Sequence, residues 1–229
     1  MPNIQPAIDT FMADITLMEK GFDQDIRKMI KRMQGMSETE LINTINQANF
    51  FQEMVDAGYG EALDKLDDEY TRVLQAAIKE ARKRGIEPLT GASIEGLETL
   101  RDLDYKRLLG RAEAHADDLR SILFRGVYGG NSIQSISAAL ESTTLASHQL
   151  NVVAYDSLAI FDDTARFKVF EGQDVRWTYI GPQDERTRDA CKQTKADEPK
   201  NGYKEKDIPS DTPIGIRGGF NCRHSWMVR

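Results

Sequence analysis

The sequence predicts a mainly α-helical protein, with long helices in the N-terminal two-thirds and a small α+β lobe at the C-terminus. Apolar residues recur at steps of three and four through residues 1–165, which places them on one side of successive helices. From residue 167 onward the sequence alternates like a strand and then becomes rich in proline and glycine. We therefore expect a helical body over residues 1–130 and a second domain over residues 131–229.

A long first helix is predicted over residues 8–33. Its apolar positions are Ile8, Phe11, Ile15, Met18, Phe22, Ile26, Met29 and Met33. This stripe is the best candidate surface for a partner protein, and packing within its own domain would also explain it. Gly35 interrupts the pattern, and Ser37 with Glu40 then matches a capping box that starts a second helix. The second helix is expected to end near residues 58–60.

Four further helices complete the predicted helical part. They cover residues 63–81, 93–125, 133–140 and 145–162. The first of them should stop at Gly85. Gly110 indicates a break in the second, because glycine weakens a helix interior by about 1 kcal/mol relative to alanine. Gly126, Gly129 and Gly130 predict a loop before the third.

The C-terminal lobe is predicted to hold two short strands and a short helix. The residues with strand-type side chains are Val169, Val175, Trp177 and Tyr179. Asp184 is expected to cap a helix that runs through Cys191. Residues 195–219 should form a loop, and residues 222–228 a final strand. The two tryptophans, Trp177 and Trp226, are expected on neighbouring strands with a shared core.

The charge of the chain is unevenly distributed, which bears on its partners. The formal net charge is −7, made up of −10 over residues 1–165 and +3 over residues 166–229. Tight DNA wrapping depends on basic side chains that displace counterions, so an acidic body argues against it. An acidic body favours a place beside a DNA path, and it also serves simply to keep a helical surface soluble.

Neither export nor membrane insertion is expected from the sequence. No apolar run approaches the roughly 20 residues that cross a bilayer. The N-terminus lacks the basic start and the apolar block of a signal peptide. We therefore expect the protein to stay in the compartment where it is made, with Cys191 and Cys222 as reduced thiols. A disulfide stays open as an alternative if the protein later meets oxidising surroundings.

Two segments of the lobe form a motif in two halves. The first half is a strand with tryptophan followed by D-x-R-T-R-x-x-C, and the second is N-C-R-H followed by S-W. The residues that define it are Trp177, Asp184, Arg186, Thr187, Cys191, Asn221, Cys222, Arg223 and Trp226. The motif resembles the C-terminal domain of phage Mu F-type minor head proteins, the phage head morphogenesis domain, over about residues 132–229. The final N-C-R-H departs from the N-C-R-C that the family also uses.

The resemblance implies a structural protein of a tailed bacteriophage and no enzymatic activity. It implies a minor head protein or a portal-associated head–tail connector (adaptor) that acts in head assembly and in DNA packaging or retention. Expected partners are the portal protein and neighbouring capsid or neck proteins, in a homo-oligomeric ring with at most indirect contact with packaged DNA and none with a membrane. The expected location is the virion, at the head or the head–tail interface, after assembly in the host cytoplasm. Residues 1–130 would bind the portal or another partner.

Within the motif, charged side chains are expected to hold the lobe together. Asp184 either pairs with Arg186, or caps the helix while Arg186 reaches the final strand. A lobe of this size has little core of its own, so such contacts are the simplest role for the whole motif.

Three residues also allow a metal site. Thiolates and imidazole are zinc ligands, so Cys191, Cys222 and His224 would supply three donors and Asp184 or His148 a fourth. The sequence has no C-x-x-C pair, and the spacing C-x-H differs from that of the commonest zinc fingers. No cofactor is therefore required by the sequence, and zinc stays an alternative.

The same residues allow two other classes of function. A thiol-dependent hydrolase or toxin-like effector would use Cys191 or Cys222 with His224, oriented by Asp184 or Asp189. A zinc-stabilised nucleic-acid-binding module is a third possibility, which the acidic charge disfavours. Another histidine, His115, lies in a charged stretch and is expected at the surface.

Overall fold

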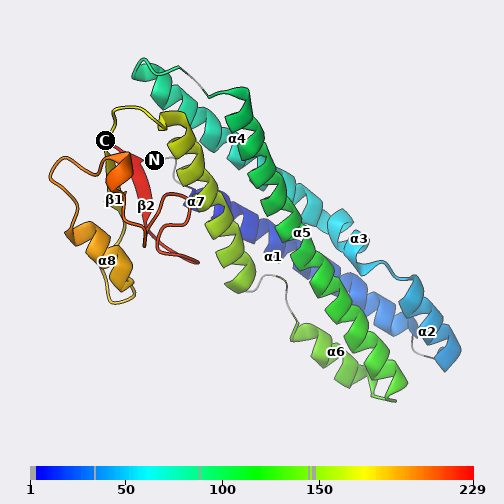
Figure 1. The fold of residues 1–229 in the computed structure, drawn as a ribbon. Coiled ribbons are helices and arrows are strands. Elements are labelled where there is room, and N and C mark those ends of the chain that lie inside the picture. The colour runs from blue at the N-terminus through cyan, green and yellow to red at the C-terminus, as the bar shows by residue number, and fades with distance from the viewer. Residues whose placement is uncertain (1–3, 34, 88, 144, 146–147) are drawn as a thin grey trace. The chain divides into compact units, whose positions relative to one another are not determined.

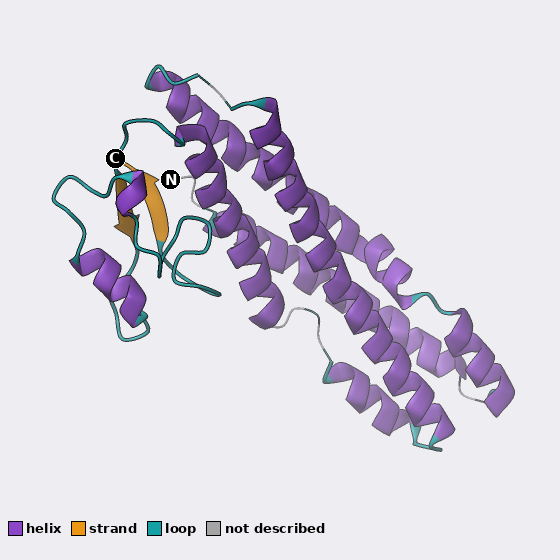
Figure 2. Cartoon of the chain, viewed as in Figure 1, coloured by secondary structure: helices purple, strands orange, loops and turns teal. Residues whose placement is uncertain are grey.

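The computed structural model describes residues 4–33, 35–87, 89–143, 145 and 148–229, and the protein is mainly helical with a small C-terminal lobe (Figures 1 and 2). The helices are α1 (Gln5–Met33), α2 (Glu38–Gln47), α3 (Phe50–Met54), α4 (Gly60–Lys83), α5 (Gly91–Tyr128), α6 (Ile133–Glu141), α7 (His148–Phe170) and α8 (Asp189–Ala196). The strands are β1 (Trp177–Ile180) and β2 (Ser225–Val228). A π-helical turn covers Val55–Tyr59, and a 3-10 turn covers Glu205–Asp207. The predicted fold class is confirmed.

The chain forms two compact units. The helical unit comprises Ile8–Leu66 and Tyr105–Asn151, and the lobe unit comprises Met1–Ala7, Asp67–Asp104 and Val152–Arg229. The predicted division into residues 1–130 and 131–229 assigns a role to each range and is a different division from these two units. It stays a prediction. No helix in the described ranges combines the length and apolar character that a membrane span needs.

The apolar stripe of α1 is part of the protein's interior. Its buried members are Ile8, Phe11, Ile15, Met18, Phe22, Ile26, Ile30 and Met33. Packing within the chain therefore accounts for the stripe, and it is not a free surface for a partner. Near the end of α1, Ile30 is buried at 5% exposure where the sequence pattern pointed to Met29, which is only half-buried.

The start of α2 follows the predicted capping box, but its end does not follow the prediction. The Ser37 hydroxyl accepts a hydrogen bond from the backbone N–H of Glu40, and the Glu40 carboxylate accepts one from the Ser37 N–H at 2.7 Å. The helix ends at Gln47, about ten residues before the predicted end. The Asn49 side chain accepts from the N–H of Gln52 and begins a new helix, because asparagine competes well for free backbone donors.

Two glycine predictions in α5 are wrong for opposite reasons. The helix continues through Gly110, where a β-carbon would meet nothing within 4 Å. Gly126 lies inside α5 and not in the loop, and a β-carbon there would lie 2.5 Å from Cγ1 of Ile136 on α6. Glycine at residue 126 thus allows α6 to pack closely against α5. His115 of the same helix is 9% exposed, so the surface position predicted for it is also wrong.

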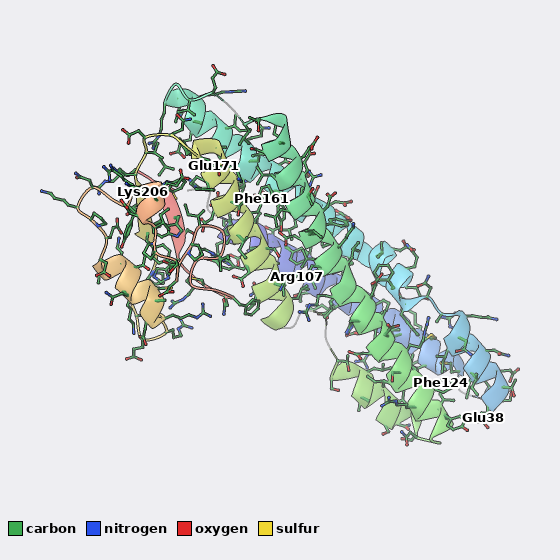
Figure 3. All side chains as sticks on the ribbon, viewed as in Figure 1. Glu38, Arg107, Phe124, Phe161, Glu171 and Lys206 are labelled. Atoms are coloured by element: carbon green, nitrogen blue, oxygen red, sulfur yellow. The ribbon has the colours of Figure 1, made fainter. Side chains whose placement is uncertain are left out.

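In the lobe unit, aromatic side chains connect the helices. Tyr70 of α4 packs edge-on against Phe161 of α7, with ring centroids 4.8 Å apart, and Phe161 is labelled in Figure 3. The Tyr70 hydroxyl donates to Asp104 of α5 at 3.2 Å. Helix α7 extends to Phe170, so the strand character predicted for Val169 is wrong. A valine on the buried side of a helix cannot be distinguished, from the sequence pattern alone, from a valine in a buried strand.

The two strands of the lobe pair antiparallel, with α8 beside them (Figure 1). Trp177 pairs with Val228, and Tyr179 pairs with Trp226. Both tryptophans are fully buried in one cluster, so the predicted shared core is confirmed. The N-cap of α8 is Arg188, so the prediction that Asp184 caps this helix is wrong. Asp184 instead closes the preceding turn, where its carboxylate accepts from the N–H of Arg186 at 3.0 Å.

Candidate functional site: a buried thiol and imidazole cluster

The structure brings together the three candidate metal ligands. Cys191 lies on α8, whereas Cys222 and His224 lie in the segment that leads into β2. The two sulfur atoms are 3.7 Å apart, and the Cys222 Sγ lies 3.9 Å from the His224 Nδ1. All three ligand atoms lie within 4.8 Å of one another. Each residue is at most 2% exposed, so the cluster is an interior feature of the lobe.

Tyr179 of β1 completes this cluster and was not predicted. Its hydroxyl lies 3.4 Å from the Cys191 Sγ and 3.7 Å from the Cys222 Sγ. Its ring stacks on His224, with centroids 5.0 Å apart and planes 13° apart. The alternation of β1 gave the signal that could have found it, since Tyr179 faces the same side of the strand as the buried Trp177.

Two glycines allow the backbone to close over the cluster. A β-carbon at Gly218 would lie 2.3 Å from the Cys191 Sγ and 3.2 Å from the Cys222 Sγ. A β-carbon at Gly181 would lie 2.3 Å from the His224 ring. The N–H of Gly218 also donates to the Cys222 Sγ at 3.4 Å. Only glycine fits at these two positions without displacement of the cluster.

Arginine side chains fix the segment that carries Cys222 and His224. Arg217 is fully buried and donates to the backbone carbonyls of Cys222 at 2.9 Å and His224 at 3.2 Å. Its guanidinium also donates to Asp156 of α7 at 3.1 Å. Arg188 donates to the carbonyl of Gly218 at 2.8 Å. The lobe is thus held by hydrogen bonds from arginine to backbone carbonyls, which are strong because the donor is charged.

The prediction that Arg186 pairs with Asp184 or reaches the final strand is wrong. Arg223 pairs with Asp184, and Arg188 and Arg217 hold the segment before the final strand. The Arg186 side chain is exposed, and its contribution to the turn is its backbone N–H. The partner of Asp184 is Arg223, at 2.5 and 2.7 Å, so the ion pair joins the two halves of the motif. The Arg223 guanidinium holds the pKa of Asp184 well below its usual range. The sequence spacing did not reveal these partners, because they lie far apart along the chain.

Buried acids on α7 form a second network that the sequence analysis missed. Asp163 is fully buried with its Oδ2 3.8 Å from the Arg217 Nε, and Asp162 pairs with the buried Arg166 at 2.7 Å. Burial raises the pKa of Asp163 to about 8, against the opposing effect of Arg217. A protonated Asp163 leaves Asp156 as the carboxylate that balances the Arg217 charge. The sequence signal was a group of acids within an otherwise apolar helix, which is unusual for a buried segment.

The environment shifts the pKa values of the two thiols in opposite directions and favours the neutral imidazole. Burial raises the pKa of Cys191. Burial opposes ionisation of Cys222 as well, but hydrogen bonds from the backbone N–H of His224, the Tyr179 hydroxyl and the Gly218 N–H lower its pKa overall. Burial lowers the pKa of His224. Cys222 is therefore the thiol that ionises first, and neutral imidazole is the form that binds metals.

The arrangement can hold a metal ion, form a disulfide or present a thiol nucleophile. Asp184 and Asp189, the acids that the sequence suggested as a further ligand or as the group that orients the imidazole, have other partners. Asp184 is engaged by Arg223, and Asp189 is fully exposed at the start of α8, where it pairs with Lys192 at 3.7 Å. The side chain of His148, the other candidate fourth ligand, lies outside the described part of the structure.

In comparisons with known proteins, no family model, no curated protein and no solved structure matches the chain.

Proposed function

We propose that the chain is a structural protein of the head of a tailed bacteriophage. It would be a minor head protein or a portal-associated head–tail connector, acting in head assembly and in DNA packaging or retention, without catalysis. One observation carries the proposal: the two motif halves that resemble the phage head morphogenesis domain are joined by the Asp184–Arg223 ion pair. The motif residues therefore serve the fold of the lobe. A folded lobe that can dock on neighbouring proteins is what an assembly protein needs.

The other motif residues also serve the fold. Trp177 and Trp226 fill the core of the lobe. The Thr187 hydroxyl donates to the carbonyl of Pro182 at 2.9 Å and so closes the turn before α8. Asn221 adopts a left-handed backbone conformation with φ of 57°, which asparagine tolerates better than most residues. Each of these roles supports a lobe that acts as a rigid docking unit.

Burial of the reactive groups and the charge distribution favour association over chemistry. The thiols of Cys191 and Cys222 are 1% and 2% exposed, so a substrate would have to displace backbone to reach them. The acidic character of residues 1–165 suits a position beside a DNA path better than a grip on DNA. Repeated head-to-tail contacts between copies would generate a ring at the portal.

Co-purification with a portal protein tests the proposal. The full chain would be co-expressed with the portal protein encoded in the same phage genome and analysed by size-exclusion chromatography with light scattering. We expect the chain to elute with the portal ring at a fixed stoichiometry. The proposal is overturned if the chain elutes alone at every ratio tested.

Matched surface variants sharpen this experiment. Phe220 is 58% exposed in the loop that the arginines hold, and Leu17 is 66% exposed on α1. If the lobe docks on the ring, Phe220→Ser should reduce co-elution while Leu17→Ser leaves it unchanged. Equal effects of the two variants would contradict docking through the lobe.

A thiol-dependent hydrolase is the second candidate function, favoured by one observation. Cys222 has a lowered pKa and lies 3.9 Å from the His224 Nδ1, an arrangement that can activate a thiol. Alkylation by iodoacetamide under native conditions separates the candidates. Slow labelling of Cys222, accelerated only by denaturant, supports the structural role, whereas rapid labelling of one cysteine in the native protein supports the hydrolase.

A further inference from the structure

We infer that Cys191, Cys222 and His224 form a structural zinc site in the lobe. The inference stands apart from the proposed function, because an assembly protein needs no metal. Two thiols and an imidazole are the donors that zinc prefers in structural sites. The three donors come from separate parts of the lobe, α8 and the segment before β2, so an ion at this position would join them.

The distances between the donor atoms fit one ion. Two sulfurs bound to a tetrahedral zinc at about 2.3 Å lie roughly 3.8 Å apart. The Cys191 and Cys222 sulfurs are 3.7 Å apart. A sulfur and a histidine nitrogen on the same ion lie roughly 3.5 Å apart, and the Cys222 Sγ and His224 Nδ1 are 3.9 Å apart. All three donor atoms lie within 4.8 Å of one another, so the Cys191 sulfur and the imidazole would approach each other by up to about 1 Å to share the ion.

The surroundings provide the hydrogen bonds that orient metal ligands. The Gly218 N–H donates to the Cys222 Sγ at 3.4 Å, which favours the thiolate. Arg217 holds the carbonyls of Cys222 and His224, so the C-x-H segment has a fixed conformation before an ion binds.

The fourth position faces Tyr179. Its hydroxyl lies 3.4 and 3.7 Å from the two sulfurs, so it can donate a hydrogen bond to a ligand thiolate. Asp184, the fourth ligand considered from the sequence, is engaged by Arg223. With Gly218 packed over the sulfurs, the site is closed, which is typical of structural rather than catalytic zinc. Small lobes with few core residues gain much of their stability from such ions.

Metal content and cobalt substitution test the site. The full chain would be purified under reducing conditions, its zinc measured by elemental analysis, and the zinc then replaced by Co²⁺. We expect one zinc per chain and a thiolate-to-cobalt charge-transfer band in the near ultraviolet. Cys222→Ser and His224→Asn should each lose the zinc and the band, whereas the control His115→Asn should keep both.

Tyr179→Phe tests the surroundings of the ion separately. Removal of a group that contacts metal ligands lowers zinc affinity by about 10–100-fold, and we expect a loss of this size in competition with a chromophoric chelator. If the ligand variants fail to fold, zinc release from the wild-type chain is followed instead, and it should lower the melting temperature. The inference is overturned if the wild-type chain binds neither zinc nor cobalt stoichiometrically, if Cys222→Ser retains the charge-transfer band, or if mass spectrometry finds a Cys191–Cys222 disulfide under the reducing conditions used.

Discussion

The helical unit and the C-terminal lobe are stabilised in different ways. In the helical unit, α1 buries a periodic stripe of apolar side chains, and this stripe is visible in the sequence. In the lobe, two strands of four residues each are held by arginine hydrogen bonds, aromatic packing and the thiol cluster. A lobe built from such short segments depends on a few specific polar contacts in addition to its aromatic core. Loss of one such contact should therefore cost more stability than loss of one exposed contact in the helical unit.

Loss of Arg217 should have the largest effect. Arg217→Met removes the partner of the buried Asp156 and the donor to two backbone carbonyls. Removal of one partner from a buried ion pair costs about 3–5 kcal/mol, and we expect this decrease in the free energy of unfolding by urea titration. The control is Arg120→Met in the helical unit, which removes an exposed donor to the Ala48 carbonyl. If both variants cost the same, the contrast between the two regions is wrong.

The buried Asp163 should make stability depend on pH in a specific direction. Its pKa is raised from 3.8 to about 8 by burial, so between these values the folded chain holds a proton that the unfolded chain has lost. This contribution is complete at low pH, falls as pH rises towards 8, and then levels off, with a slope of at most about 1.4 kcal/mol per pH unit. The charged groups that face it are Arg217, Asp162 and Arg166.

Substitution of Asp163 isolates this contribution. Asp163→Asn cannot ionise, so thermal unfolding from pH 4 to pH 8 should show a flatter loss of stability than in the wild-type chain. An unchanged pH profile would mean that Asp163 is ionised in the folded protein.

The same glycine-to-alanine change should have opposite signs in the two regions. Gly218→Ala places a methyl group against the Cys191 Sγ and should cost about 1–3 kcal/mol through overpacking. Gly110→Ala in α5 meets nothing within 4 Å and should stabilise the helix by up to about 1 kcal/mol. Melting temperatures of the two variants measure this directly. A neutral Gly218→Ala would show that the cluster is loosely packed.

The Asp184–Arg223 ion pair should have the smallest effect on stability, although it joins the two motif halves. Both side chains are substantially exposed, at 41% and 31%, and exposed ion pairs contribute little. A double-mutant cycle with Asp184→Asn and Arg223→Gln should give a small coupling that vanishes in high salt. A large, salt-independent coupling would show that this pair also acts as a buried contact.

Local patterns in the sequence predicted local structure well. Ser37 and Glu40 began α2 as expected, and the alternation at residues 175–179 indicated β1. These features depend on neighbours within a few residues. Asn49 was missed as a helix start, because the apolar positions on both sides of it fit one continuous helix.

The three donor residues of the candidate site could be predicted from their chemistry. The residues that hold them in place could not. Cys191, Cys222 and His224 were named from their chemistry, and the structure places them together. Arg217 and its partner Asp156 are separated by 61 residues and carry no local pattern, so the sequence could not pair them. The choice of Arg186 over Arg223 for Asp184 failed for the same reason, since nearness along the chain was the only guide.

Cryo-EM of purified particles of the phage whose genome encodes this chain tests the central claim most directly. The account predicts density for the chain at the portal vertex, in symmetric copies, with the lobe in contact with the ring or its neighbours. Particles that contain the portal but lack the chain, at a resolution that would reveal it, would contradict the account.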